Sequence, residues 1–116
     1  MPELIARPSL KALRTDDSLV LRIAGELDLH AALHHGPRID RALVARPPRT
    51  VADLHGVTFL DCSGLSLLIR VRRQVARWGG EFTVYCPNRK ALRILRYVDV
   101  GPPLDFVEQL PEPSLS

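Results

Sequence analysis

The segment from residue 62 to residue 80 constrains the fold more strongly than any other part of the chain. In a helical projection, one narrow arc is polar and holds Ser66, Arg70, Arg73 and Arg77. The opposite side is apolar and holds Leu67, Leu68, Val71, Val75 and Trp78. This pattern predicts an amphipathic helix of about 15 residues that buries one face. Gly79-Gly80 is its stop signal. The basic run at 70–77 is either a solvated helix face, which the periodicity favours, or an electrostatic footprint for phosphates.

Strand and helix patterns precede this segment. Residues 18–24 alternate, which predicts a strand that ends at Gly25 and buries Leu19, Leu21 and Ile23. Residues 29–44 have helical spacing, and the expected core positions are Leu33, Ile39 and Leu43. Because Pro37 lacks a backbone donor, we expect a kink or a restart of this helix near it.

The remaining segments continue the alternation. We expect a loop at 46–50, a strand at 50–54, a loop at 54–64 and a strand at 81–86. A helix follows, which Asn88 caps, Leu92 and Leu95 anchor inward, and Gly101-Pro102-Pro103 closes. A short element at 104–110 and a frayed tail at 111–116 complete the chain. Strands and helices that alternate at these spacings predict an α/β domain with parallel crossover units. The length fits one domain, residues 1–116, with a core at about 18–100 and flexible ends.

Composition argues against several functional classes. The formal net charge is only +3, and the basic residues are spread along the chain, which is a weak signal for nucleic acid. No apolar run approaches the roughly 20 residues of a membrane span, and no secretory leader is evident. The two cysteines, Cys62 and Cys86, form neither a disulfide framework nor a CxxC pair. We therefore expect a soluble cytoplasmic protein that has no membrane contact and binds no nucleic acid directly.

The turn Asp61-Cys62-Ser63-Gly64 stands where a parallel strand leads into the amphipathic helix. Such loops are the usual functional positions of α/β domains. Asp61 is the expected N-cap, so Cys62 and Ser63 fall in the first helical turn, where unpaired N–H groups attract anions. The turn is either a phosphate or phosphorylation site or only a helix cap.

Three segments together resemble the STAS domains of anti-sigma factor antagonists. They are "LRIAGELDLHAA", "VADLHGVTFLDCSGLSLLI" and "WGGEFTVYCPNRKALRIL", in order between about residues 18 and 100. The resemblance implies a mixed sheet of four to five strands with helices packed against it. It also implies a bacterial regulator that binds an anti-sigma factor, usually a serine kinase with a histidine-kinase-like ATPase fold, and so releases a sigma factor for transcription.

The resemblance further implies a phosphorylation switch at the helix start, reversed by a phosphatase. The family's phosphorylated hydroxyl commonly follows the aspartate, and that position here is Cys62. Ser63 matches the second, normally unmodified hydroxyl. The residues expected to contact the partner are Asp28, Asp61, Cys62, Ser63, Gly64, Leu65 and Ser66.

Four interpretations of Cys62 remain open. Without a hydroxyl at this position, the protein binds its partner constitutively. Alternatively, the kinase uses Ser63, which the projection places near the exposed Ser66 and Arg70 face. In the third interpretation Cys62 is a redox switch, because helix amino termini favour reactive thiolates. In the fourth it is a buried or half-buried packing residue, and the partner binds elsewhere.

Other polar residues are weaker candidates. Asp28 is expected either to cap a helix or to contact the partner. His30 and His34 have the i, i+4 spacing of metal ligands, with His35 adjacent, but no carboxylate or cysteine completes a motif, so we predict neither a metal nor a cofactor. A hydrolase built on Cys62 and His55, with Asp61 as a third member, is the least favoured alternative.

The sequence therefore favours a protein-interaction domain without catalytic activity. The main alternative is a STAS-type module of another assembly, such as a signalling scaffold or a transporter subunit.

Overall fold

The computed structural model describes residues 9–97 and 104–110. Its elements in chain order are β1 (Ser9–Arg14), β2 (Ser18–Leu27), α1 (Leu29–Ala42), the 3₁₀ helix η2 (Leu43–Ala45), β3 (Arg49–Leu60), α2 (Cys62–Ala76), β4 (Glu81–Tyr85), α3 (Arg89–Tyr97) and β5 (Asp105–Val107). No helix in this described part is long and apolar enough to cross a membrane.

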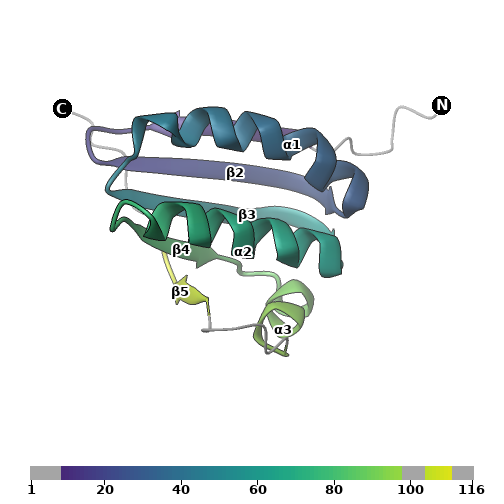
Figure 1. The fold of residues 1–116 in the computed structure, drawn as a ribbon. Coiled ribbons are helices and arrows are strands. Elements are labelled where there is room, and N and C mark those ends of the chain that lie inside the picture. The colour runs from purple at the N-terminus through teal and green to yellow at the C-terminus, as the bar shows by residue number, and fades with distance from the viewer. Residues whose placement is uncertain (1–8, 98–103, 111–116) are drawn as a thin grey trace.

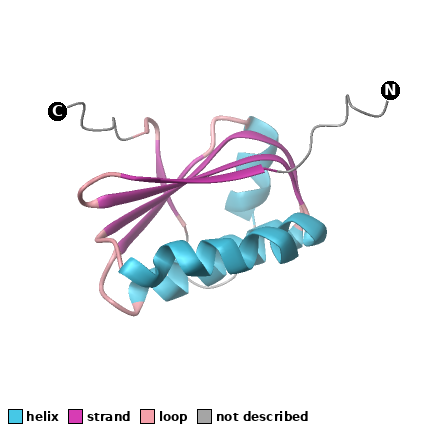
Figure 2. Cartoon of the chain, turned by 90° about the horizontal axis from the view of Figure 1, so that it is seen from above, coloured by secondary structure: helices cyan, strands magenta, loops and turns pink. Residues whose placement is uncertain are grey.

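The strands form one sheet in the order β1-β2-β3-β4-β5. β1 is antiparallel to β2, and the other neighbours are parallel, which confirms the expected mixed sheet of an α/β domain. Successive parallel strands joined in this order by crossovers of one hand place their helices on one face. Figure 2 shows α1 and α2 side by side below the sheet. The core lies between this helical layer and the sheet, and it contains the predicted Leu19, Leu21 and Ile23.

α2 confirms the sequence prediction most fully. It spans 15 residues, and Leu67, Leu68, Val71 and Val75 are buried while Ser66, Arg70 and Arg73 are exposed. Gly79 has a φ of 73°, the left-handed conformation that favours glycine. The Gly80 N–H then donates to the Val75 carbonyl at 3.0 Å. The predicted stop signal is therefore confirmed.

The carboxyl ends of β2 and β3 extend beyond their predictions. β2 passes through Gly25, whose φ is 87°, and ends at Leu27. β3 continues to Leu60 where a loop was expected at 54–64. Both predictions were wrong because the strands stay paired to Leu27 and Leu60, with register shifts that absorb the irregularity. Long-range pairing therefore overrides the local glycine signals in this region.

α1 also differs from its prediction. The helix is continuous through Pro37 rather than restarting there. Leu33 was expected in the core, yet its side chain is 69% exposed. The residues that face the sheet are Ala31, His35 and Ile39, with Leu43 following at the same four-residue spacing. The prediction placed Leu33 in the core because it is apolar. The rotation of the helix about its axis instead turns His35 toward the sheet.

The first strand and the carboxyl-terminal elements complete the comparison with the sequence predictions. β1 was not predicted, and it pairs with β2 along residues 9–14. Asn88 caps α3 as expected, since its Oδ1 accepts from the N–H groups of Lys90 and Ala91 at 3.0 and 3.3 Å. β5 is the expected short element within 104–110. The predicted stop at Gly101-Pro102-Pro103 and the tail at 111–116 lie outside the described residues.

Candidate functional site

The amino termini of α1 and α2 lie at the same edge of the sheet (Figure 1). They follow the carboxyl ends of β2 and β3, where Leu27 and Leu60 are paired. The Asp61 N–H donates to the Leu27 carbonyl at 3.4 Å, which ties the start of α2 to the end of β2. The residues that the sequence placed in two separate turns are therefore neighbours. We call this region the helix-start edge: Asp28, Leu29 and Leu33 from α1, and Asp61, Cys62, Ser63 and Ser66 from α2.

Asp61 caps α2, as predicted. Its backbone is extended, and its Oδ1 accepts from the N–H groups of Ser63 at 2.9 Å and Gly64 at 3.2 Å. Two of the four unpaired donors of the helix start are thereby satisfied. The cap fixes the direction of the first turn, so the position of Cys62 is set by Asp61.

Cys62 is the first residue of α2, and its thiol is free and exposed. This exposure contradicts the interpretation of Cys62 as a packing residue. Cys86 is also free but buried, and burial raises the pKa of its thiol. Cys62 is therefore the more accessible of the two thiols.

The next residues separate into contact and support positions. Ser63 is half-buried rather than fully exposed, and Ser66 is exposed one turn further along. Gly64 and Leu65 are buried. A Cβ on Gly64 would lie 2.8 Å from Cγ of Leu27 and closer still to its carbonyl oxygen, so the close approach of α2 to β2 requires glycine. Partner contact through these residues stays a prediction.

Asp28 caps α1 in the same way. Its side chain accepts from the Ala31 N–H at 3.0 Å, and its backbone is extended. The capping role left open by the sequence is therefore present. Asp28 remains half-buried, so its second expected role, partner contact, stays a prediction.

Two apolar residues at the helix-start edge were not predicted to be exposed: Leu29 was not singled out, and Leu33 was expected in the core. Leu29 and Leu33 are 57% and 69% exposed and follow the Asp28 cap. They share a helix face with Gly36 and Asp40. Asp40 forms an ion pair with Arg70 of α2, and a Cβ on Gly36 would lie 3.3 Å from Nη1 of Arg70. The leucines therefore face the side of α1 on which α2 lies. The four-residue spacing of Leu43 and Ile39 continues to His35 and Ala31, so it places Leu29 and Leu33 outside the buried face. The sequence alone could have shown this orientation.

A cysteine hydrolase at this edge is not supported. His55 lies within β3, and its Nδ1 is 2.8 Å from Oδ1 of the fully buried Asp53. Strand residues advance about 3.3 Å each, so His55 lies roughly 16 Å from the end of β3, where α2 begins. Asp53 also accepts from Nε of Arg22 at 3.2 Å. His55 is therefore committed to a separate hydrogen bond with Asp53 and does not approach Cys62.

The histidines of α1 do not converge on a metal site. His30 and His34 are exposed, while His35 is buried and points toward the sheet. Within residues 9–97 and 104–110, no three His, Cys, Asp or Glu side chains are grouped closely enough to hold a metal ion. The i, i+4 spacing of His30 and His34 therefore gains no third ligand from the described residues.

Comparisons with known proteins agree with the fold. A STAS domain family model matches residues 9–107. An anti-sigma F factor antagonist from Lysinibacillus sphaericus is 27% identical over 89 residues, which are 76% of this chain and 76% of that protein. The anti-sigma factor antagonist SpoIIAA in its unphosphorylated form has a TM-score of 0.68 at 19% identity, over 90% of both chains.

An anti-sigma factor antagonist from Mycobacterium paratuberculosis has a TM-score of 0.67 at 24% identity, over 76% of this chain and 77% of that one. These structural likenesses show a shared fold. The family model covers most of the sequence, and the chain belongs to the STAS domain family.

Proposed function

We propose that this protein is a cytoplasmic anti-sigma factor antagonist that acts by binding and not by catalysis. The observation that carries the proposal is the exposed Cys62 at the first position of α2, held by the Asp61 cap. The segment that contains it resembles the turn at which the family is regulated. Its curated relative from Lysinibacillus sphaericus is named an anti-sigma F factor antagonist. By sequestering an anti-sigma factor, the protein would release a sigma factor for transcription.

The partner we propose is an anti-sigma factor of the serine-kinase type. The helix-start edge suits protein recognition because large apolar side chains are exposed beside the capped turn: Leu29 at 57% and Leu33 at 69%. Apolar groups gathered on a surface favour association through burial. The expected contacts Asp28, Asp61, Cys62, Ser63 and Ser66 surround them, and Gly64 and Leu65 support the turn from behind.

We propose that Cys62 makes this binding constitutive. A phosphoserine at the first position of α2 would add about −1.5 to −2 charges to the docking surface and change its affinity. A thiol has nearly the size of a hydroxyl but accepts no ordinary phosphoester. Ser63 is the alternative acceptor, but it is half-buried and its N–H is bound by Asp61, which restricts the first turn. A phosphatase partner is needed only if Ser63 is modified.

The test is a kinase and binding assay with the purified wild type, Cys62→Ser and Ser63→Ala. Each protein is incubated with a purified ATPase-type anti-sigma kinase of the same genome and with ATP, and peptide mass spectrometry locates phosphate. We expect binding and no phosphate on the wild type, and phosphate on residue 62 with weaker binding for Cys62→Ser. Phosphate on the wild type that disappears in Ser63→Ala would overturn constitutive binding but not antagonism. Absence of binding to every such kinase would overturn the proposed function.

A further inference from the structure

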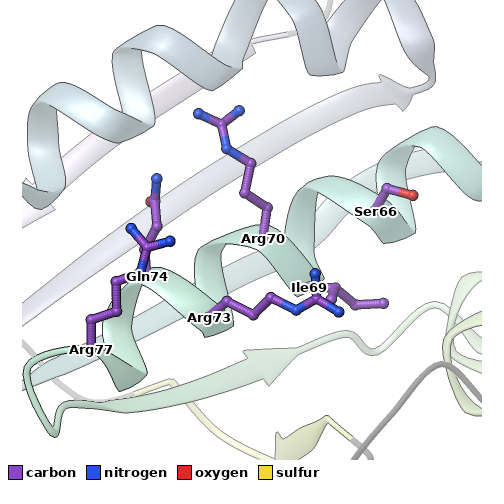
Figure 3. Close-up of a pocket in the computed structure, with 6 residues that line it drawn as sticks. All are labelled: Ser66, Ile69, Arg70, Arg73, Gln74 and Arg77. Carbon is purple, nitrogen blue, oxygen red and sulfur yellow. The ribbon is translucent and has the colours of Figure 1, made fainter.

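The outer side of α2 has a shallow hollow of about 560 Å³ (Figure 3). The residues that line it all come from α2 and its C-cap: Ser66, Ile69, Arg70, Arg73, Gln74 and Arg77. The three arginines share one helix face, since they are spaced three and four residues apart, and they cover about 10 Å along the axis. We call Arg70, Arg73 and Arg77 the arginine face.

Most of the charge of the arginine face is not neutralised by residues 9–97 and 104–110. Nη2 of Arg70 forms an ion pair with Asp40 of α1, and Nε2 of Gln74 donates to the same carboxylate at 2.9 Å. α2 contains no acidic residue, and Asp40 is the one acidic residue of α1. Among the described residues, neither Arg73 nor Arg77 pairs with a carboxylate. The hollow therefore offers two free guanidinium groups.

The side chains in the hollow are arranged to receive a polar ligand. Arg70 extends toward α1, whereas Arg73 extends along α2 toward its amino-terminal end (Figure 3). Oε1 of Gln74 is buried and has no hydrogen-bond partner among the described residues. Ile69 adds an apolar component to the lining. A ligand here would supply carboxylates to the arginines.

The number of free guanidinium groups indicates whether the ligand of the hollow is an acidic protein segment or a nucleic acid. Nucleic-acid binding typically neutralises some 6–10 phosphates, far more than Arg73 and Arg77 provide. A guanidinium group presents a planar fork that matches a carboxylate in two parallel hydrogen bonds. One row of arginines along one helix matches an acidic helix whose carboxylates repeat at three- and four-residue spacing. A protein segment is therefore the ligand that this geometry favours.

We propose that the arginine face binds an acidic segment of the anti-sigma partner. This inference rests on the proposed function and extends it, because Ser66 lies both at the helix-start edge and in the hollow. A partner seated on Leu33 and Cys62 would continue along α2 and place its carboxylates on Arg73 and Arg77. The apolar end of this surface would supply burial, and the arginine face would supply orientation and faster association.

The first experiment compares two double charge reversals in the full chain. Arg73→Glu with Arg77→Glu changes the arginine face. Arg14→Glu with Arg41→Glu makes the same change in charge at a separate hollow beside β1. With the purified anti-sigma kinase, we expect the first pair to weaken binding by about tenfold and to lower its salt dependence, and the control pair to change binding less than about twofold. Thermal melting verifies that both variants are folded.

The second experiment needs no natural partner. The ¹⁵N-labelled wild type is titrated with a helical peptide bearing glutamates at i, i+3, i+4 and i+7, with a peptide bearing glutamines at the same positions, and with a short DNA duplex. We expect amide shifts within residues 66–77 from the glutamate peptide alone. If the duplex binds more tightly, or no shift occurs on α2, the inference is overturned.

The two experiments separate the inference from the proposed function. If the kinase binds the wild type and the Arg73→Glu, Arg77→Glu variant equally well, the arginine face has no role in binding and antagonism stands. If no kinase binds but the glutamate peptide still shifts α2, the proposed function fails, and the arginine face remains a site for acidic protein segments.

Discussion

α1 and α2 lie side by side on the same face of the sheet (Figure 2), yet they differ in how strictly they separate apolar from polar residues. α2 buries Leu67 and Leu68 and exposes its arginines. α1 buries His35 completely and leaves Leu33 69% exposed. The first arrangement favours folding, and the second does not. Departures from simple patterning are expected at functional sites, which is why the proposed docking surface includes the amino-terminal half of α1.

The largest expected difference is between two leucine truncations. Leu68→Ala removes a side chain that is 1% exposed and should lower the free energy of unfolding by about 3 kcal/mol, because it leaves a cavity. Leu33→Ala should lower it by less than about 0.5 kcal/mol. Urea unfolding of both variants measures the difference. Equal losses would show that Leu33 is packed in the core and would abolish the contrast between the helices.

The same pair of variants also separates folding from function. We expect Leu33→Ala to weaken binding of an anti-sigma kinase by about tenfold, as truncation of a central apolar contact does. Leu68→Ala should keep its affinity under conditions where it stays folded. Isothermal titration calorimetry checks both values. Full affinity of Leu33→Ala would contradict its place in the docking surface.

The two aspartate caps give the next comparison. Asp61 accepts two backbone hydrogen bonds and Asp28 accepts one. Loss of a cap costs about 0.5–2 kcal/mol, so we expect Asp61→Ala near the upper end of this range and Asp28→Ala near the middle. Chemical denaturation measures both. Asp61→Asn is the matched control, because asparagine caps almost as well. A larger loss of stability in Asp28→Ala than in Asp61→Ala would contradict this ranking of the two caps.

Buried His35 should make α1 sensitive to pH, whereas α2 buries no titratable group. Burial, and then the charges of His34 and Arg38, hold the pKa of His35 below its ordinary value of 6.5. The unfolded chain therefore binds more protons than the folded one as the pH falls through 6.5. Stability should be complete above this pH and should decline below it. Denaturation at pH 7.5 and 5.5 measures the change.

A matched variant assigns that pH dependence. Neither ring nitrogen of His35 has a hydrogen-bond partner among the described residues. His35→Leu should therefore raise the free energy of unfolding at neutral pH by about 1 kcal/mol and flatten its decline in acid. His30→Gln changes an exposed histidine of the same helix and should leave the decline intact. A decline of wild-type size in His35→Leu would assign it to other groups.

Patterns within one element were predictable from the sequence. The buried face of α2, the Asp61 and Asn88 caps and the Gly79-Gly80 stop depend on residues within about four positions of one another, and the structure contains all of them. The resemblance of three segments to STAS domains gave the mixed sheet. Predictions from short-range patterns and from the family resemblance therefore matched the structure where no contact with a distant segment was involved.

Features that depend on distant segments were not predictable. β1 and the extension of β3 to Leu60 exist because β2 pairs with both of them over its length. The phase of α1 depends on which residues meet the sheet, and His35 occupies a position that a leucine would be expected to fill. The exposed thiol of Cys62 follows from the cap geometry, but its proposed role in regulation depends on a partner surface outside this chain.

The smallest expected effect concerns the contact that joins the two helices. Asp40 and Arg70 form an ion pair while 39% and 52% exposed, so a double-mutant cycle with alanine should give a coupling of only about 0.5 kcal/mol, which salt reduces. Asp40→Ala should cost more than Arg70→Ala, because Gln74 also donates to Asp40. Asp40→Ala also frees Arg70 and should tighten binding of the glutamate peptide. A coupling several times larger would mean that this pair fixes α1 against α2 and that Arg70 belongs to the fold rather than to the binding surface.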